Sequence, residues 1–145
     1  MKWQEAFSVG IPEIDEQHKA LVDCITLVEE AIALPRDRRG WSAVHALLGR
    51  LSDYVRIHFA VEESLMRIHG YPEFEQHAAE HREFAVRLKD LLEKSLREDV
   101  AGATAAFLNE WLRQHILVQD MRYARYLPEA GVVKTLRRSR RTANS

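Results

Sequence analysis

Two short phrases constrain this chain most, His58-Phe-Ala-Val-Glu62 and His77-Ala-Ala-Glu-His81. On an α-helix, residues four apart lie on the same face about one turn apart, so each phrase directs two metal-ligand side chains the same way. Between the phrases, residues 70–72 read Gly-Tyr-Pro, and glycine and proline are strong helix-stopping signals. The phrases therefore predict successive antiparallel helices whose paired ligands meet across an interface.

Apolar residues recur in helical rhythm through four stretches of the chain. No stretch shows the period-two alternation typical of a half-buried strand. We expect helices over residues 12–34, about 41–69 and about 72–97, and a fourth from near Gly102 to Pro128. Amphipathic helices with short connections predict an all-α protein, an antiparallel up-down-up-down four-helix bundle.

Two segments flank the predicted bundle. Residues 1–11 contain apolar side chains without sustained periodicity, and we expect an N-terminal arm packed over the core. Residues 132–145 hold 5 of the 21 basic side chains and none of the 22 acidic ones, so the rest of the chain has a net charge of −6. We predict one domain over residues 1–131 and a flexible basic C-terminal tail over residues 132–145.

The composition excludes several classes of protein. A hydrophobic content of 46% with 30% charged residues is ordinary for a globular domain. No apolar run approaches the roughly 20 residues that span a bilayer, and no signal-peptide core is present, so we expect a cytoplasmic protein without membrane insertion. The single cysteine, Cys24, excludes an internal disulfide. The tail lacks interleaved aromatic side chains, so we expect no nucleic-acid module, although the tail could dock an acidic partner or anionic lipid.

Histidines are concentrated on the predicted apolar faces. A lone histidine there is usually a hydrogen-bonded core residue. Here five of the seven histidines share that position, namely His18, His58, His77, His81 and His115. Burying them with carboxylates and no cation would cost on the order of several kcal/mol per unpaired group, more than a marginally stable domain can spare. The set predicts a metal site, from which His45 and His69 are left out because of their positions on their helix.

Two carboxylates complete the predicted ligand set. Glu62 shares a face with His58, whereas Glu63 points about 140° away and is expected to be a solvated or surface-paired acid. Asp120 follows His115 by five residues, an interval that separates side chains by about 140° on a regular α-helix. If both bind one centre, the helix must be locally widened, so we predict a π-type bulge between His115 and Asp120.

The complete pattern resembles the hemerythrin family, and is most similar to its single-domain bacterial branch. All seven ligand positions are filled, and the resemblance covers about residues 3–128. The tail lies outside it. Neighbouring phrases that agree are Ile14-Asp15-Glu16-Gln17-His18-Lys19, Gly70-Tyr71-Pro72, and Trp111-Leu112 before His115-Ile116.

This resemblance implies two iron ions (Fe²⁺/Fe³⁺) joined by an oxo or hydroxo bridge and by Glu62 and Asp120. One iron would be coordinatively full, held by His77, His81 and His115. The other would be held by His18 and His58. If each iron takes about six ligands, one position on this second iron stays open for dioxygen.

Reversible oxygen binding requires a dry pocket, because water and stray protons promote loss of reduced oxygen species. The apolar side chains expected around the open position, which also suit plain core packing, are Leu21, Phe59, Trp111, Leu112 and Val118. Gln17 and Tyr54 are plausible supports for the ligands. Asp15 could act in the same way or serve the start of its helix.

Several hypotheses stay open beside the leading one, a monomer that stores, delivers or senses dioxygen and can supply an oxygen-requiring enzyme. A di-iron enzyme could remove peroxide or nitric oxide at the same site. No histidine here has a glutamate three residues before it, as ferritin-like di-iron proteins do, so we do not expect an enzyme. A sensor could dock its partner through the tail, and a zinc-filled structural bundle would be colourless.

Overall fold

The computed structural model describes residues 2–35 and 37–129, and every statement below concerns those residues. They form helices and no strand. The elements are η1 (Glu5–Phe7), α1 (Pro12–Ile32), α2 (Arg38–Ile68), α3 (Phe74–Lys94), α4 (Ala101–Leu112), η2 (Arg113–Asp120) and α5 (Met121–Glu129). The predicted tail and the domain boundary at residue 131 lie outside the described residues.

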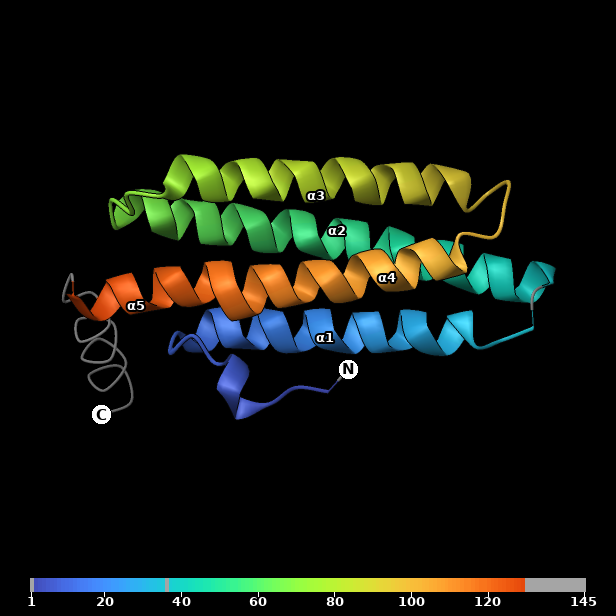
Figure 1. Ribbon diagram of the computed structural model, residues 1–145, viewed down its shortest axis with the longest axis horizontal. Coiled ribbons are helices and arrows are strands. Elements are labelled where there is room, and N and C mark those ends of the chain that lie inside the picture. Colours follow the sequence, from blue (N-terminus) through green and yellow to red (C-terminus); the bar gives the residue numbers. More distant parts are fainter. Residues whose placement is uncertain (1, 36, 130–145) are drawn as a thin grey trace.

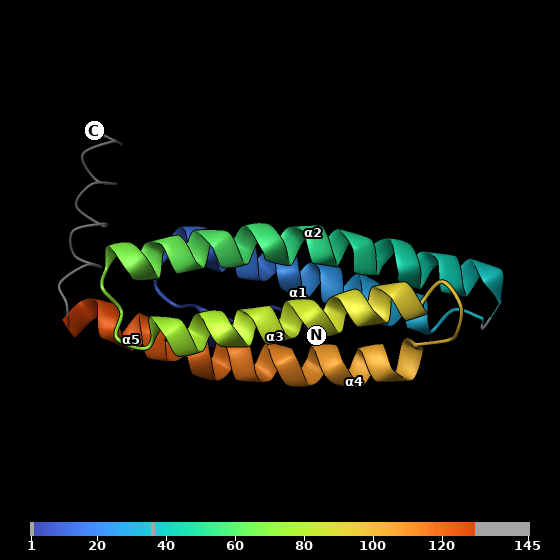
Figure 2. The same cartoon turned by 90° about the horizontal axis from the view of Figure 1, so that it is seen from above.

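The helices are arranged as four antiparallel rods, with α4, η2 and α5 joined end to end as the fourth (Figure 1). Helix α1 packs against α2 and α4, and α2 packs against α3. Seen from above, α3 lies beside the fourth rod (Figure 2). The predicted all-α, up-down-up-down bundle is confirmed. No described helix is both long and apolar enough to cross a membrane.

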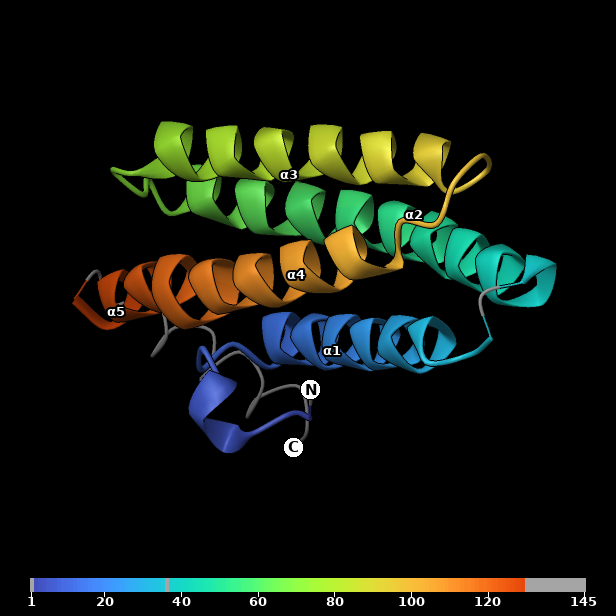
Figure 3. The ribbon, with the colours of Figure 1, turned by 45° about the vertical axis from the view of Figure 1, so that its right-hand side comes forward.

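The N-terminal arm lies against the lower side of α1 (Figure 3). Its side chains Phe7, Val9 and Ile11 are buried, as expected for an arm packed over the core. The Asp15 carboxylate accepts hydrogen bonds from Ser8 Oγ at 2.5 Å and from the Val9 amide at 2.8 Å. Asp15 lies in the first turn of α1 and therefore ties the N-terminal arm to the start of this helix.

The turn between α1 and α2 explains why α2 begins earlier than the predicted residue 41. Asp37 caps the helix, because its carboxylate accepts hydrogen bonds from the amides of Arg39 at 2.9 Å and Gly40 at 3.3 Å. A Cβ at Gly40 would lie 2.3 Å from the Pro35 carbonyl oxygen. Glycine thus lets the first turn of α2 approach the end of α1.

The turn between α2 and α3 is a Schellman motif. Gly70 adopts a φ of +64°, the left-handed region that favours glycine. The Tyr71 amide donates to the Met66 carbonyl at 2.9 Å, and the Gly70 amide donates to the Arg67 carbonyl at 3.2 Å. Tyr71 and Met66 belong to one apolar cluster, so the motif closes α2 and also buries the end of the bundle.

The core consists of two apolar clusters on either side of a polar layer. The larger includes Leu21 on α1, Leu48 on α2 and Leu88 on α3. The smaller occupies the end of the bundle nearest α5 and contains Val9, Ile11, Ile14, Met66, Tyr71, Tyr123 and Leu127. Along each rod, the predicted metal ligands fall between residues of the two clusters. The site is therefore shielded along the bundle axis in both directions.

The predicted widening of the fourth rod is confirmed, because η2 is π-helical from Arg113 to Asp120. An extra residue in the turn rotates the following helix by about 100° relative to a regular α-helix. The buried positions after His115 are consequently Ile116, Asp120 and Tyr123, whereas Val118 is 36% exposed. The prediction that Val118 lines the site is wrong, because it continued the α-helical period through the widened turn.

Candidate metal centre

All seven predicted ligand side chains meet in one buried cluster. Their ligand atoms form two overlapping groups, and within each group the atoms lie within 4.8 Å of one another. Each side chain belongs to a residue that is at most 2% exposed. The contributors are His18 from α1, His58 and Glu62 from α2, His77 and His81 from α3, and His115 and Asp120 from η2.

Glu62 lies between two sets of histidines. Its Oε2 atom is 3.4 Å from His58 Nε2 and 3.9 Å from His18 Nε2. Its Oε1 atom faces the other side, 2.6, 3.2 and 3.7 Å from the Nε2 atoms of His77, His81 and His115. We call the first set the two-histidine side and the second set the three-histidine side. The carboxylate has the geometry needed to bridge two cations.

Asp120 also contacts both sides. Its Oδ2 atom is 2.9 Å from His18 Nε2 and 3.1 Å from His115 Nε2. Its Oδ1 atom is 3.1 Å from His77 Nε2. Because η2 is π-helical, Asp120 and His115 face the cluster together despite their spacing of five residues. The two carboxylates thus approach the same space from α2 and from the fourth rod.

The cluster satisfies few of its own polar atoms. Among the described residues, buried atoms without an aligned hydrogen bond include both ring nitrogens of His18 and His115, Nε2 of His58 and His81, Oε2 of Glu62 and both carboxylate oxygens of Asp120. Buried polar atoms without partners are costly, and metal ions supply the missing interactions. Imidazoles and carboxylates without a thiolate fit iron, and also manganese, cobalt or zinc.

The electrostatics of the protein alone divide the cluster. Burial by itself would lower the pKa of His77, but the Asp120 and Glu62 carboxylates beside its Nε2 atom raise it to about 10. Burial lowers the pKa of His58 to about 3 and also holds the pKa of His115 well below its ordinary value. In the absence of metal, a proton is therefore held at His77, and a metal ion must displace it.

The outer nitrogen of His58 is held by a side chain on α1. The Nδ1 atom of His58 lies 2.7 Å from Gln17 Oε1, which accepts a hydrogen bond from Nδ1–H and leaves Nε2 facing the cluster. The Tyr54 hydroxyl donates to the Gln17 backbone carbonyl at 2.9 Å. These contacts agree with the supporting roles expected for Gln17 and Tyr54.

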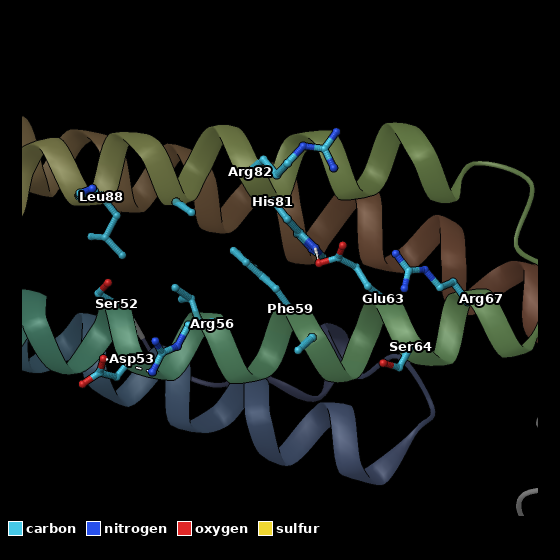
Figure 4. A pocket seen from close by; sticks show the side chains of 14 residues that line it. Ser52, Asp53, Arg56, Phe59, Glu63, Ser64, Arg67, His81, Arg82 and Leu88 are labelled. Carbon is cyan, nitrogen blue, oxygen red and sulfur yellow. Dashed lines mark hydrogen bonds and ion pairs between the residues drawn. The ribbon is translucent and has the colours of Figure 1, made fainter.

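Glu63 is the functional neighbour that the sequence interpretation missed. Its Oε2 atom lies 3.1 Å from His81 Nδ1, and the two side chains point toward one another in Figure 4. Glu63 does point away from His58, but that direction is where α3 packs. The contact could have been predicted from the packing of α3 against α2, because His81 extends from α3 toward Glu63.

The two remaining histidines lie outside the cluster, as expected. His45 Nδ1 lies 2.8 Å from Ser95 Oγ, and His69 Nδ1 lies 2.7 Å from the Tyr123 hydroxyl. Both rings therefore have a partner that requires no metal. The separation between these hydrogen-bonded histidines and the poorly satisfied cluster supports the distinction made from the sequence.

The predicted apolar wall is partly as expected. Leu21 and Leu112 are fully buried in the larger apolar cluster. Phe59 stacks on the His81 ring with the ring centroids 3.9 Å apart, and Trp111 stacks on the His115 ring at 4.5 Å. Their shortest ring contacts with the cluster are therefore on the three-histidine side, whereas they were predicted around the open position of the two-histidine side. Ile116 was not predicted, yet it is 1% exposed and directly follows His115. Helical spacing could have predicted its burial, because Ile116 follows the buried Leu112 by four residues.

Two pockets reach the three-histidine side from opposite flanks of α3. The one between α2 and α3, which we call the basic groove, has a volume of about 570 Å³ and is lined by Phe59, Glu63 and His81 (Figure 4). The other, between α3 and the fourth rod, has a volume of about 310 Å³ and is lined by Trp111 and His115. Neither pocket is lined by His18 or His58.

A four-helix bundle that gathers five imidazoles and two carboxylates in its core defines a class, the helical proteins with a cluster suited to a pair of metal ions. The family model described as "Hemerythrin HHE cation binding domain" matches residues 9–127. The chain therefore belongs to the hemerythrin family. This agrees with the resemblance seen in the sequence.

Relatives from bacteria and animals share most of the chain. A bacteriohemerythrin from Stenotrophomonas maltophilia is 32% identical over 84% of this chain and 78% of its own length. A bacteriohemerythrin from Methylococcus capsulatus is 32% identical over 85% of this chain and 93% of its own length. A myohemerythrin from Riftia pachyptila is 30% identical over 83% of this chain and 88% of its own length. A crystal structure of wild-type hemerythrin superposes with a TM-score of 0.77 at 31% identity, covering 86% of this chain and 95% of that one.

Proposed function

We propose that this protein binds dioxygen reversibly at a non-haem di-iron centre, for oxygen storage, delivery or sensing. One observation carries the proposal: the two oxygens of a single buried carboxylate, Glu62, face different sets of histidines. Such a carboxylate suits two ions better than one. An iron pair held by these residues, with an oxo or hydroxo bridge, would supply the electrons and the open coordination position that dioxygen binding needs.

The seven ligand side chains would have different roles in holding the iron pair. Glu62 and Asp120 would bridge the pair, since each lies within 4 Å of ligand nitrogens on both sides. The three-histidine side would be coordinatively full. The two-histidine side, with His18 and His58, has one ligand fewer and would keep the open position. A single small vacancy suits a diatomic ligand and suits a bulky substrate poorly.

Neighbouring residues would keep the open side dry and oriented. Leu21 lies one turn from His18 and is 0% exposed, and Leu112 is 2% exposed, so this part of the core excludes water. Gln17 fixes the His58 ring through Nδ1, so that Nε2 points inward. Among the apolar wall residues none can donate or accept a proton at the vacancy, which favours reversible binding over catalysis.

An optical spectrum tests the proposal. The full chain is loaded anaerobically with Fe²⁺, and spectra are taken before air, after air, and after removal of oxygen, with metal analysis of the same sample. We expect about two irons per chain and a visible band that appears with oxygen and disappears without it. Irreversible oxidation in one exposure, or a colourless protein filled with zinc, contradicts the proposal.

A comparison of turnover and autoxidation rates tests the alternative that the protein is an enzyme. Turnover of hydrogen peroxide or nitric oxide by the iron-loaded protein is compared with its autoxidation in air. We expect turnover no faster than autoxidation, because the described wall residues next to the two-histidine side are apolar. Faster turnover would make the protein a di-iron enzyme.

We propose further that the protein acts as a cytoplasmic monomer and can hand oxygen to an oxygen-requiring enzyme. The support is the family membership, together with the composition of the chain. Light scattering of the iron-loaded protein tests the first part, with a mass near 16.8 kDa expected. A stable mass of twice that value contradicts it.

A further inference from the structure

The pocket between α3 and the fourth rod has an acidic rim. Glu80 and Glu83 contribute from α3, and Glu110 contributes from α4. Glu83 and Glu110 are exposed, and Glu80 is half-buried. We call this the acidic vestibule. None of its three acids forms an ion pair with another described residue, so their charges are available to a cation in solution.

One cation also lines the vestibule, and it lies over an aromatic ring of the same pocket. The Arg87 guanidinium lies 4.6 Å from the centroid of the Phe107 ring. Three carboxylates against one guanidinium leave a local excess of negative charge. Clefts lined by one sign of charge concentrate the opposite ion and raise its rate of arrival.

The inner wall of the vestibule is a side chain of the metal cluster. His115 lines the pocket, is 2% exposed, and has no hydrogen-bond partner on either ring nitrogen among the described residues. His58 and His81 differ, because Gln17 and Glu63 bind their Nδ1 atoms. A cation in the vestibule therefore meets an unsatisfied imidazole. That imidazole belongs to both groups of ligand atoms.

The same wall is the irregular part of the bundle. Gln114, His115 and Gln119 all line the vestibule and all belong to η2. A π-helix is a rare, less favourable arrangement than the α-helix and recurs at functional sites. Since η2 also carries Asp120, the segment that lines the vestibule holds two of the seven cluster ligands.

The basic groove on the other flank of α3 has the opposite character. Its rim carries four basic side chains, Arg56, Arg67, Arg82 and Lys89, against the two acids Asp53 and Glu63. Figure 4 shows the Arg82 side chain near His81 on α3 and the Arg67 side chain beside Glu63 on α2. This groove also reaches a cluster histidine, but its charge disfavours the approach of a cation.

We propose that the acidic vestibule is the route by which a divalent metal cation reaches the cluster, with His115 as the first cluster ligand it meets. The rim carboxylates attract the hydrated ion and replace part of its water shell. The inference depends on the proposed metal site but is independent of what the loaded protein does with oxygen.

Metal-loading kinetics test the route. Metal-free, full-length protein is mixed with Co²⁺ in a stopped-flow instrument, and the visible absorbance of the bound ion is followed. The variant Glu80→Gln, Glu83→Gln, Glu110→Gln should load about tenfold more slowly at low ionic strength. The difference should shrink at about 0.5 M salt, where exposed charges are screened. Final stoichiometry should be unchanged.

The matched control removes the same charge elsewhere. Glu16→Gln, Asp23→Asn, Glu30→Gln neutralises three exposed acids on α1, which does not line the vestibule. It should load at nearly the parental rate. A double variant, Glu83→Gln, Glu110→Gln, changes only exposed positions and should load at an intermediate rate, which separates the effect from any disturbance at half-buried Glu80.

Two results would contradict the proposal that metal enters through the vestibule. One is that the triple variant loads at the parental rate, and the other is that the α1 control slows loading equally. Failure of the parental protein to bind Co²⁺ at all would instead overturn the metal site on which the proposed function stands. The two failures are therefore distinguishable in one experiment.

Discussion

The two sides of the cluster contain the same kinds of ligand but have different surroundings. On the two-histidine side, with His18 and His58, the fully buried Leu21 lies one turn from His18. The three-histidine side contacts a pocket on each flank of α3, through His81 and through His115. All of these imidazoles are equally buried, so burial of the ligands does not decide access. The side chains just beyond them differ. They separate an apolar face, where we propose that dioxygen binds, from a charged face, where we propose that metal enters.

The largest expected effect comes from removing the residue that joins the two sides. Glu62→Ala deletes the carboxylate whose oxygens face both sets of histidines. Breaking a buried, paired charge costs several kcal/mol, so the affinity for the second metal ion should fall roughly 10³-fold or more. Isothermal titration with Co²⁺ and metal analysis measure it. Exposed Glu16→Gln is the control, and retention of two ions by Glu62→Ala would show that the sides do not depend on a shared bridge.

The next largest effect tests the dry side. Leu21→Ala leaves a cavity one turn from His18 and should lower the free energy of unfolding by about 2 to 5 kcal/mol. It should also admit water and speed autoxidation of the oxygenated protein, followed as loss of its visible band. Ala85→Gly, at an exposed position of the basic groove, is the control that leaves the dry side intact. Unchanged autoxidation in Leu21→Ala would remove the assigned role of the leucines.

A paired substitution compares the outer partners of the two sides. Gln17→Leu removes the acceptor for His58 Nδ1, and Glu63→Gln removes the charge that faces His81 Nδ1. Loss of such partners typically costs about 10 to 100-fold in metal affinity. Competition with a chelator of known affinity measures both. If only one variant weakens binding, the supports of the two sides are not equivalent.

Metal affinity should depend on pH, mainly through His77. The pKa of His77 is raised to about 10, so the metal-free protein holds a proton there at neutral pH. Metal binding releases that proton, and affinity should fall about tenfold for each unit that the pH drops below this pKa. His58 should contribute no such term at neutral pH, because burial lowers its pKa to about 3. The pKa of His18 is raised despite burial, because the Asp120 carboxylate lies beside its ring, so His18 should add to the pH dependence. Titrations in buffers of different ionisation enthalpy count the protons, and release of none contradicts the assignment.

The smallest expected effect checks the rotation introduced by η2. Val118→Lys places a charge at a position that is 36% exposed and should change the free energy of unfolding by less than about 0.5 kcal/mol. The same change at Ile116, which is 1% exposed, should destabilise the fold strongly. Denaturant unfolding of both variants measures the difference. A large loss of unfolding free energy in Val118→Lys would mean that the helix keeps its regular α-helical period.

The sequence predicted the bundle and the composition of the cluster because both depend on local spacing. Residues four apart share a helix face, so His58 with Glu62 and His77 with His81 could be paired without knowing what lies opposite. The five-residue spacing to Asp120 even required a π-helical turn, which η2 contains. The same reasoning failed at Val118. The π-helical turn rotates every residue that follows it about the helix axis, and the prediction for Val118 did not include that rotation.

Other features could not be predicted because they depend on which helix lies next to which. Glu63 was expected at the surface, but the packing of α3 against α2 brings it to His81. The early start of α2 depends on the approach of Gly40 to the Pro35 carbonyl. The opposite charges of the two pockets combine side chains from α2, α3 and α4 that no single stretch contains.

By itself, the sequence determined which side chains would be clustered, how many there are, and that four helices would carry them, since helical periodicity is a property of consecutive residues. The tertiary structure alone decided which side of the cluster is sealed by leucines and which opens to charged pockets. The physical reason is that solvent access and local charge are set by side chains brought together from different helices, and packing brings them within a few ångströms only after the chain has folded.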